Sequence, residues 1–279
     1  MTDYETLKVS KAGAVVTIRL NRPEAANAFN HTLETELYDA LKACDQDDGV
    51  KCAVLTAEGV NFSSGHDIRQ LAHEVIDGVE PKTIEGKNWV RTGELLPPWW
   101  FSKALVVAVK GFVGPHANTV LLAADVVVAA ENSRFSWEET RVGTGAPFGP
   151  YALMPFHFPM RVLKQLWIAG GWMDAQTAER LFYVNRVVPL GEEEALATRY
   201  AEQFARMELG HLVANKRGVH KLYEAAGLPA MVANGRDPYV PEGEAQEALL
   251  HHFRLICEQG VGAAARSRDE GWDDELSKV

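Results

Sequence analysis

The sequence is poor in cysteine and in long apolar runs. Its three cysteines, Cys44, Cys52 and Cys257, are too few and too scattered for a disulfide framework or a zinc site, so free thiols in a reducing compartment are expected. No apolar run reaches the roughly 18 residues that a membrane helix needs. The acidic N-terminal residues also lack the apolar segment of a signal peptide. These absences predict a cytoplasmic protein without a membrane partner and without a metal site.

Basic charge is also scarce. Lys and Arg number 28 against 38 Asp and Glu, which gives a formal net charge of −10. Because such a surface repels phosphate backbones, nucleic acid is not an expected partner. An anionic small molecule can still bind at a local basic patch or at backbone N–H groups. The 279 residues suffice for one large domain or two smaller ones, each with its own core.

Strand and helix signals alternate in the first two thirds of the chain. Short, continuously apolar runs are typical of parallel strands that are covered on both faces, and the amphipathic runs between them have helical spacing. We therefore predict an α/β core over residues 1–190. The expected strands are Ala14–Leu20, Cys52–Thr56, Ala104–Val109, Asp125–Ala130 and Val184–Val188, and the expected helices between them are His31–Ala43 and Ala117–Ala123.

Helical patterns dominate the last third, and we predict a separate helical region over residues 191–279. Asp174 is a plausible N-cap for a helix that begins at Ala175. The turn-forming stretch Asn234–Gly243 is the expected hinge within this region. The expected helices from residue 161 onward are Arg161–Ala169, Ala175–Leu181, Glu192–Arg206, Ala214–Ala226 and Glu244–Glu258.

The densest chemical signal is Asn61–Leu71, which reads NFSSGHDIRQL. An apolar strand precedes it, and Gly65 permits a tight turn into a helical run that begins at Asp67. The N–H of His66 would then lie unpaired near a helix start, where it could hold an anion or a developing oxyanion. The alternative is an ordinary strand-to-helix turn capped by Asp67.

A second segment, Lys110–Leu122, has the same design. Pro115 has no N–H to donate, so His116 offers the first one, with an imidazole beside it. The alternative for His116 is a capping or core histidine. If the two turns are neighbours, the N–H groups of His66 and His116 form an oxyanion hole, in which one donor is typically worth about 3–4 kcal/mol.

The third segment, Phe135–Gly149, carries the adjacent glutamates Glu138 and Glu139 before a glycine-rich stretch. Adjacent side chains point in different directions, so at most one of them is expected to face a pocket. A glutamate pressed against aromatic rings has a raised pKa and can act as a general acid or base. The alternative is a solvated charge pair with Arg141.

These segments, in this order, resemble the crotonase (enoyl-CoA hydratase/isomerase) superfamily. The matching stretches are LNRPEAANAFN at Leu20–Asn30, NFSSGHDI at Asn61–Ile68, VKGFVG…AADVVVAAENSRF from Val109 to Phe135, Glu139 with Gly143, and VNRVVP at Val184–Pro189. The resemblance implies a ββα spiral core, a C-terminal helical oligomerisation region, and a homotrimer or dimer of trimers. It also implies an acyl-CoA substrate and no cofactor other than the coenzyme A that the substrate carries.

Site roles follow from the resemblance position by position. The two oxyanion donors fall on His66 and His116, and the second catalytic glutamate falls on Glu139. Thr119 stands where hydratases carry their first glutamate, and Arg69 stands where a basic residue often meets coenzyme A. A hydratase needs two carboxylates to hold and split water, so ordinary hydration of a straight-chain enoyl-CoA is not expected.

Two subfamilies share these departures in part. Hydroxycinnamoyl-CoA hydratase-lyases are similar in having a hydroxyl residue where Thr119 lies. The 6-oxocamphor hydrolase type, which cleaves cyclic β-diketones that carry no coenzyme A, is similar in having a histidine where His116 lies. Glu24-Ala25-Ala26 also lacks the basic residue that often meets the phosphates of coenzyme A.

Three functions therefore stay open. The leading one is lyase, isomerase or hydrolase chemistry on an acyl-CoA thioester, with Glu139 as acid/base and with the His116 ring and Thr119 orienting water or substrate. Aromatic residues, among them Trp137 and Phe148, suggest a bulky or cyclic acyl group, unless they fill the core or a subunit interface. The others are hydrolysis of a C–C bond in a cyclic diketone and an inactive member whose Glu139 is held by Arg141.

Overall fold

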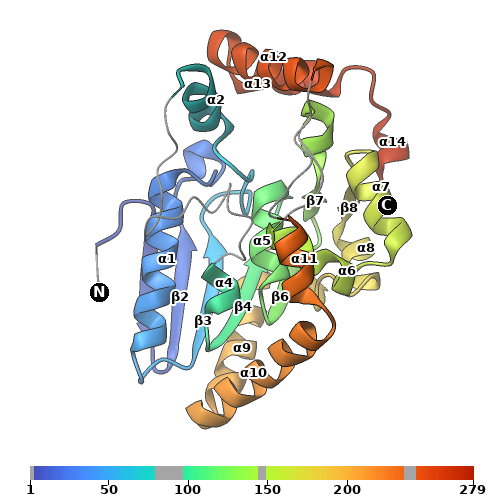
Figure 1. The fold of residues 1–279 in the computed structure, drawn as a ribbon. Coiled ribbons are helices and arrows are strands. Elements are labelled where there is room, and N and C mark those ends of the chain that lie inside the picture. The colour runs from blue at the N-terminus through green and yellow to red at the C-terminus, as the bar shows by residue number, and fades with distance from the viewer. Residues whose placement is uncertain (1–2, 79–96, 144–148, 236–242) are drawn as a thin grey trace.

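The computed structural model describes residues 3–78, 97–143, 149–235 and 243–279. The predicted hinge Asn234–Gly243 and the residue Phe148 lie wholly or largely outside these ranges. Within them, a mixed α/β arrangement is evident, with a central sheet below and a group of helices above it in the view of Figure 1.

The central sheet has the strand order β1-β2-β3-β4-β6-β9. The β1–β2 pair is antiparallel, and every other neighbouring pair is parallel. Parallel strands bring their carboxyl ends to one edge, from which the chain turns into helices. The strands are β1 (Leu7–Ala12), β2 (Val15–Leu20), β3 (Cys52–Ala57), β4 (Ala104–Val109), β6 (Val126–Ala130) and β9 (Arg186–Val188).

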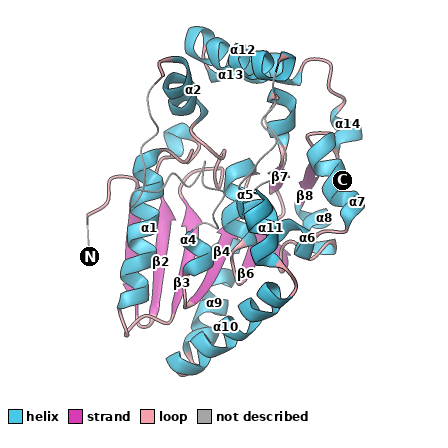
Figure 2. Ribbon diagram, viewed as in Figure 1, coloured by secondary structure: helices cyan, strands magenta, loops and turns pink. Residues whose placement is uncertain are grey.

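A second, smaller sheet with the order β5-β7-β8 lies beyond the end of the first (Figure 2). β5 pairs with β7 in parallel, and β7 pairs with β8 antiparallel. The strands are β5 (Phe112–Val113), β7 (Arg134–Ser136) and β8 (Trp172–Asp174). His116 lies in the segment that follows β5, and Glu139 lies in the segment that follows β7.

Helices account for most of the remaining described residues. In the first part of the chain they are η1 (Pro23–Ala25), α1 (His31–Gln46), α2 (Ile68–Ile76), α4 (Pro97–Trp100), α5 (Pro115–Leu122), η2 (Glu138–Val142), η3 (Gly149–Leu153), α6 (Met154–His157), α7 (Met160–Ile168) and α8 (Ala175–Arg180). In the last part they are α9 (Glu193–Ala205), α10 (Leu209–Ala225), α11 (Leu228–Gly235), α12 (Glu244–Gln259), α13 (Val261–Asp269) and α14 (Asp274–Ser277).

Both faces of the central sheet are covered, as the apolar strands require. In β3, Ala53 and Leu55 belong to the main core with α1, whereas Cys52 and Val54 face a second cluster with α9. Because successive side chains of a strand point to opposite faces, a fully apolar strand must be covered twice. The α/β prediction is therefore confirmed, and the helix expected over Glu192–Arg206 covers the second face as α9.

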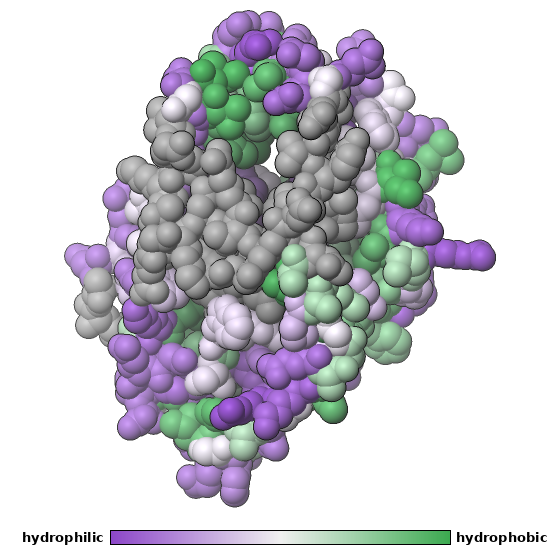
Figure 3. Space-filling model, in the orientation of Figure 1, coloured by the Kyte–Doolittle hydropathy of each residue, from purple (hydrophilic) through white to green (hydrophobic). Residues whose placement is uncertain are grey.

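A third apolar cluster lies apart from the sheet. Ala72 of α2 packs with Phe253 and Ile256 of α12 and with Ala264 of α13. Figure 3 shows apolar surface at this junction, beneath a hydrophilic outer rim. The helix that follows His66 is therefore braced by residues near the C-terminus of the chain.

Element boundaries differ from the predictions by a few residues. The helix expected over Ala117–Ala123 begins earlier, at Pro115, and Asp174 caps α8 as expected, accepting from the backbone N–H of Thr177 at 2.8 Å. The division at residue 190 stays a prediction, since α9 packs on the sheet. Among the described helices, none has both the length and the apolar character that crossing a membrane requires.

Candidate active site

His66 lies in the turn between β3 and α2. Gly65, with φ of +93°, makes the turn, and its carbonyl accepts from the N–H of Phe29 at 2.8 Å. The N–H of Asp67 donates back to the carbonyl of Phe29 at 2.9 Å, and the side chain of Asp67 caps α2. The intervening N–H of His66 has no acceptor among the described residues. This is the donor that the sequence predicts.

His116 lies in the first turn of α5. Gly114 is the N-cap, and Pro115 occupies the first helical position, where its missing N–H costs nothing. The first amide of the helix is therefore that of His116, and within the described ranges it too has no acceptor. Free N–H groups at a helix start favour negative charge.

The two turns pack main chain against main chain. The N–H of Gly114 donates to the carbonyl of Ser63 at 2.8 Å, and the N–H of Ser63 donates to the carbonyl of Phe112 at 3.3 Å. A Cβ at Gly114 would lie 2.1 Å from the carbonyl oxygen of Ser64, and one at Gly65 would lie 3.3 Å from the amide nitrogen of His116. Glycine is thus required at Gly114 for this close approach.

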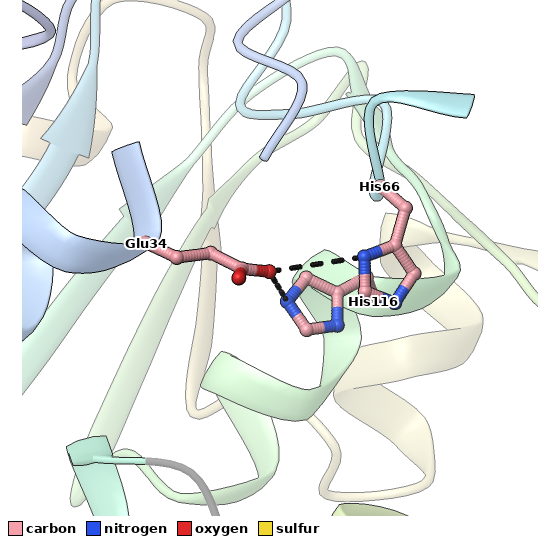
Figure 4. Close-up of side chains that lie close together, drawn as sticks. All are labelled: Glu34, His66 and His116. Atoms are coloured by element: carbon pink, nitrogen blue, oxygen red, sulfur yellow. Dashed lines mark ion pairs between the residues drawn. The ribbon is translucent and has the colours of Figure 1, made fainter. Parts of the chain in front are cut away.

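The side chains of the two histidines meet a glutamate from α1. Their rings stack with centroids 3.7 Å apart, and the edge of Phe29 packs against His116. Glu34 Oε1 lies 3.3 Å from His116 Nε2 and 3.8 Å from His66 Nδ1 (Figure 4). Burial, together with the neighbouring His116, holds the pKa of His66 well below its usual range, so its ring is neutral.

Glu34, His66 and His116 also form the one group of three potential metal-ligating side chains found in the described ranges. Their ligand atoms all lie within 4.8 Å of one another. Two imidazoles and a carboxylate are ligands typical of transition-metal sites.

Glu139 lies in η2, directly after the small sheet. The hydroxyl of Tyr151 in η3 donates to Glu139 Oε1 at 2.7 Å. Burial raises the pKa of Glu139 from 4.5 to about 7, although the hydrogen bond from Tyr151 acts in the opposite direction. Near neutral pH this carboxyl group can both accept and donate a proton, as the sequence analysis requires of an acid/base.

The neighbouring charges are paired elsewhere. Glu138 lies 2.9 Å from Arg268 and 3.6 Å from Arg134. Arg141 pairs with Asp269 at 3.1 Å and with Asp274 at 3.6 Å. The expectations that Arg141 forms a charge pair with these glutamates, or holds Glu139 in an inactive protein, are therefore wrong. C-terminal aspartates outcompete the glutamates for this guanidinium.

A side-chain hydrogen bond links the helix of His116 to the strand that precedes η2. Asn118 of α5 donates from Nδ2 to the carbonyl of Ser136, at the end of β7 and just before η2, at 2.8 Å. Thr119 is buried, and its hydroxyl donates to the carbonyl of His116 at 2.6 Å. The proton of Thr119 is thus used within the helix, and its oxygen can act on a ligand only as an acceptor.

The predicted substrate-binding residues are placed apart. Arg69 is exposed on the first turn of α2, and Phe148 lies outside the described residues. Trp137 is fully buried and packs edge-on against Phe158 and Tyr183. This burial favours the alternative that Trp137 fills the core.

Two residues of the site were not singled out from the sequence. Glu34 reaches the histidines because the Phe29–His66 bridge brings the start of α1 to the first turn. Tyr151 reaches Glu139 across a segment that includes residues 144–148, outside the described ranges. For Tyr151, its position shortly after a glycine-rich stretch was the one available signal. For Glu34, the sequence contained no signal of its contact with the histidines.

Comparisons with known proteins agree with this architecture. A family model described as enoyl-CoA hydratase/isomerase matches residues 10–238. A probable enoyl-CoA hydratase from Rhizobium meliloti is 32% identical over 79% of this chain and 83% of its own length. The 1,2-epoxyphenylacetyl-CoA isomerase of Escherichia coli is 29% identical over 69% of this chain and 71% of its own.

A solved structure supports the fold independently. The enoyl-CoA hydratase/isomerase from Xanthobacter autotrophicus superposes with a TM-score of 0.81 at 24% identity, covering 96% of this chain and 98% of that one. At this level of identity the likeness establishes the fold alone.

Proposed function

Because the chain belongs to the enoyl-CoA hydratase/isomerase family, we propose that it acts on an acyl-CoA thioester and stabilises its enolate or oxyanion form at the backbone N–H groups of His66 and His116. Membership makes the protein an enzyme of the crotonase superfamily, and the predicted α/β fold is confirmed. The main support for the proposed site is the pair of adjoining turns, each of which leaves one amide without an acceptor among the described residues.

Glu139 is the proposed acid/base. Its carboxylate removes a proton from the carbon next to the thioester carbonyl. The electron pair of that C–H bond forms the C=C bond of the enolate, and the π pair of the carbonyl moves onto its oxygen. The same carboxyl group then returns the proton to carbon or gives it to a leaving group. With a pKa of about 7, Glu139 has both forms available near neutral pH.

The imidazole of His116 and the hydroxyl of Thr119 are proposed to orient water or substrate beside this centre. The His116 ring contacts Glu34, and the Thr119 oxygen retains acceptor capacity. Isomerase, lyase and hydrolase reactions share the enolate or oxyanion, so the specific outcome depends on the acyl group.

We further propose a bulky or cyclic acyl group. The name of one relative, 1,2-epoxyphenylacetyl-CoA isomerase, specifies such a substrate for that protein. Trp137 does not support this part of the proposal, because it is enclosed by the core.

A second candidate is hydrolysis of a C–C bond in a cyclic β-diketone without coenzyme A. The observation that favours it is the imidazole of His116 at the oxyanion turn, in contact with Glu34. Glu24-Ala25-Ala26 carries no basic residue for the phosphates of coenzyme A. The nearby Arg22 pairs with Asp67 at 3.2 Å, so its charge is already neutralised and does not replace that contact.

Substitution of Glu139 tests the proposed acid/base. We expect Glu139→Gln to lower kcat by roughly 10²–10⁴-fold and to leave the affinity for the same thioester nearly unchanged, because the amide keeps the shape but cannot carry the proton. Single-turnover kinetics and calorimetric binding measure the two effects. Unchanged turnover of a substrate that wild type converts would reject Glu139 as the acid/base.

A ligand screen separates the candidate substrates. A ligand that binds the native state raises the melting temperature, so free coenzyme A, aryl and alkyl acyl-CoA thioesters and cyclic diketones can be compared. We expect stabilisation by coenzyme A and the thioesters. Stabilisation by diketones alone would favour the second candidate, and an absence of any stabilisation would contradict both.

The assembly and location are also proposals. We propose a homotrimer or dimer of trimers, with residues 191–279 supplying the oligomerisation region, and a cytoplasmic location. Light scattering on the eluting protein measures the mass of the assembly. A monomer would contradict the proposed assembly.

A further inference from the structure

Three ligand-type side chains converge beside the proposed oxyanion turns. They come from three separate elements: Glu34 from α1, His66 from the turn before α2, and His116 from the first turn of α5. Figure 4 shows the carboxylate and two ring nitrogens directed toward one another. His116 is largely buried, whereas Glu34 and His66 retain partial exposure, so the group is accessible from one side.

The spacing is compatible with ligation of one ion by all three side chains. Glu34 Oε1 lies 3.3 Å from His116 Nε2, and two ligands about 2.0–2.1 Å from a tetrahedral zinc ion are themselves roughly 3.3 Å apart. The 3.8 Å contact with His66 Nδ1 is too long for a hydrogen bond. It needs to close by only a few tenths of an ångström, on the order of a small side-chain rotation, to match the same geometry.

The surrounding charge also fits a cation. In the described part of the chain, the ion-pairing partners of Glu34 within 4.0 Å are these two imidazoles, with no lysine or arginine among them. A partly buried carboxylate is stabilised by a positive charge in contact with it. An ion between the three side chains supplies that charge.

Backbone contacts hold the segments that carry the three donors in place before any ion arrives. The bridge between Phe29 and His66 fixes the first turn to the start of α1, and Asn30 caps α1 through the N–H of Leu33 at 2.9 Å. The ring of Phe29 then lies edge-on to His116. With the backbone fixed in this way, side-chain rotation alone is needed to bring the three donors onto one ion.

We propose that Glu34, His66 and His116 bind one divalent first-row transition-metal ion, with Zn²⁺ as the best match to two nitrogen donors and one oxygen donor. The sequence alone predicts no metal site. Three protein ligands leave a position for water or a substrate oxygen next to the two backbone amides. The site shares His116 with the proposed acyl-CoA chemistry but not the acid/base Glu139, and its metal binding can be measured without any thioester.

Coordination requires a specific movement. Nitrogen lone pairs lie in the ring planes, and the two rings are now stacked with an interplanar angle of 23°. We expect binding to turn the rings out of this stack so that both nitrogens point at the ion. A crystal structure of the zinc-soaked protein shows this directly.

The first test is calorimetric titration of chelator-treated protein, carrying no affinity tag, with ZnCl₂. We expect one equivalent to bind to wild type. Glu34→Gln and His66→Ala should each weaken binding at least about tenfold, since loss even of an outer hydrogen-bond partner costs about 10–100-fold. His31→Ala is the matched control, because His31 pairs with Glu74 at 2.7 Å but has no second imidazole in that pair.

A second measurement guards against misfolded variants. Co²⁺ added to wild type should give the intense visible absorption of a four-coordinate site with nitrogen ligands, and one equivalent of Zn²⁺ should abolish it. Wild type that takes up no stoichiometric Zn²⁺ and gives no such absorption would overturn the proposal. Undiminished zinc binding by correctly folded Glu34→Gln and His66→Ala variants would overturn it as well.

Discussion

The two sides of the candidate active site use different kinds of chemical group. On the oxyanion side, the working groups are backbone amides held by main-chain contacts between the turns at Gly65 and Gly114. On the acid side, the working group is the side chain of Glu139, set by burial and by Tyr151. Donors supplied by the backbone persist through most side-chain substitutions but are lost when the turn moves. An acid/base supplied by a side chain is lost when that one residue is replaced.

We expect the largest effect from a substitution that displaces the backbone donors. In Gly114→Ala, the new Cβ would lie 2.1 Å from the carbonyl oxygen of Ser64, so the turns must separate. We expect a loss of about 3 kcal/mol or more in the free energy of unfolding. Turnover should fall roughly 10²–10³-fold, the usual cost of one oxyanion donor.

The control for that change is Gly218→Ala in α10, where a Cβ would meet nothing within 4 Å. Helix propensity predicts a gain of about 0.5–1 kcal/mol there. Urea unfolding of both variants measures the difference. If Gly114→Ala were as stable as wild type, the close packing of the turns would be wrong.

The next effect concerns the titration of Glu139. Its folded-state pKa of about 7 exceeds the ordinary 4.5, so the native state holds this proton over a range in which the unfolded chain has lost it. The stability conferred by the neutral carboxyl is present in full below pH 4.5, decreases as pH rises, and is lost above about pH 7.

Comparison with Glu139→Gln isolates this contribution, because glutamine does not titrate. Relative to the variant, wild type should lose roughly 3 kcal/mol of unfolding free energy between acidic and neutral pH. Chemical denaturation at several pH values measures the trend. A constant difference between the two proteins would contradict the raised pKa.

A smaller effect separates the adjacent glutamates. Glu138→Gln leaves Arg134 and Arg268 without the carboxylate that they now contact, so we expect a loss of about 1–3 kcal/mol in stability. Turnover by this variant should stay close to wild type, in contrast to that of Glu139→Gln. A large loss of turnover with unchanged stability would reverse the roles assigned to the two residues.

The smallest expected effect is that of Tyr151→Phe. The tyrosine hydroxyl donates to Glu139 and lowers the pKa of that carboxyl, so its removal should raise the pKa further. The corresponding limb of the pH profile of kcat/KM should move to higher pH. Turnover at neutral pH should fall by less than about tenfold, because one such hydrogen bond is worth about 1 kcal/mol. A limb displaced to lower pH would contradict this contact.

The fold was predictable where burial is continuous. The strands β3 and β4 are buried at every position, and α9 shows a clear amphipathic face. By contrast, β1 is mostly exposed, and β5 has two residues, which is too short for any alternation of side chains to be recognised.

The site was predictable where it depends on local chain conformation. Glycine and proline around His66 and His116 determine which backbone N–H groups lack an acceptor among the described residues. Those glycines and prolines can be recognised directly in the sequence. The contacts of Glu34 and Tyr151 arise instead from the packing of distant segments, which residue spacing does not encode.

The brace on α2 has a consequence for the order of assembly. α2 starts directly after the turn that holds His66, and its apolar side is covered by Phe253, Ile256 and Ala264. During synthesis these residues leave the ribosome long after α2, and domains consolidate as their parts emerge. The apolar side of α2 therefore stays uncovered until these residues have been made, and a product truncated before α12 should retain its sheet and the turn at Gly65 while losing order in α2.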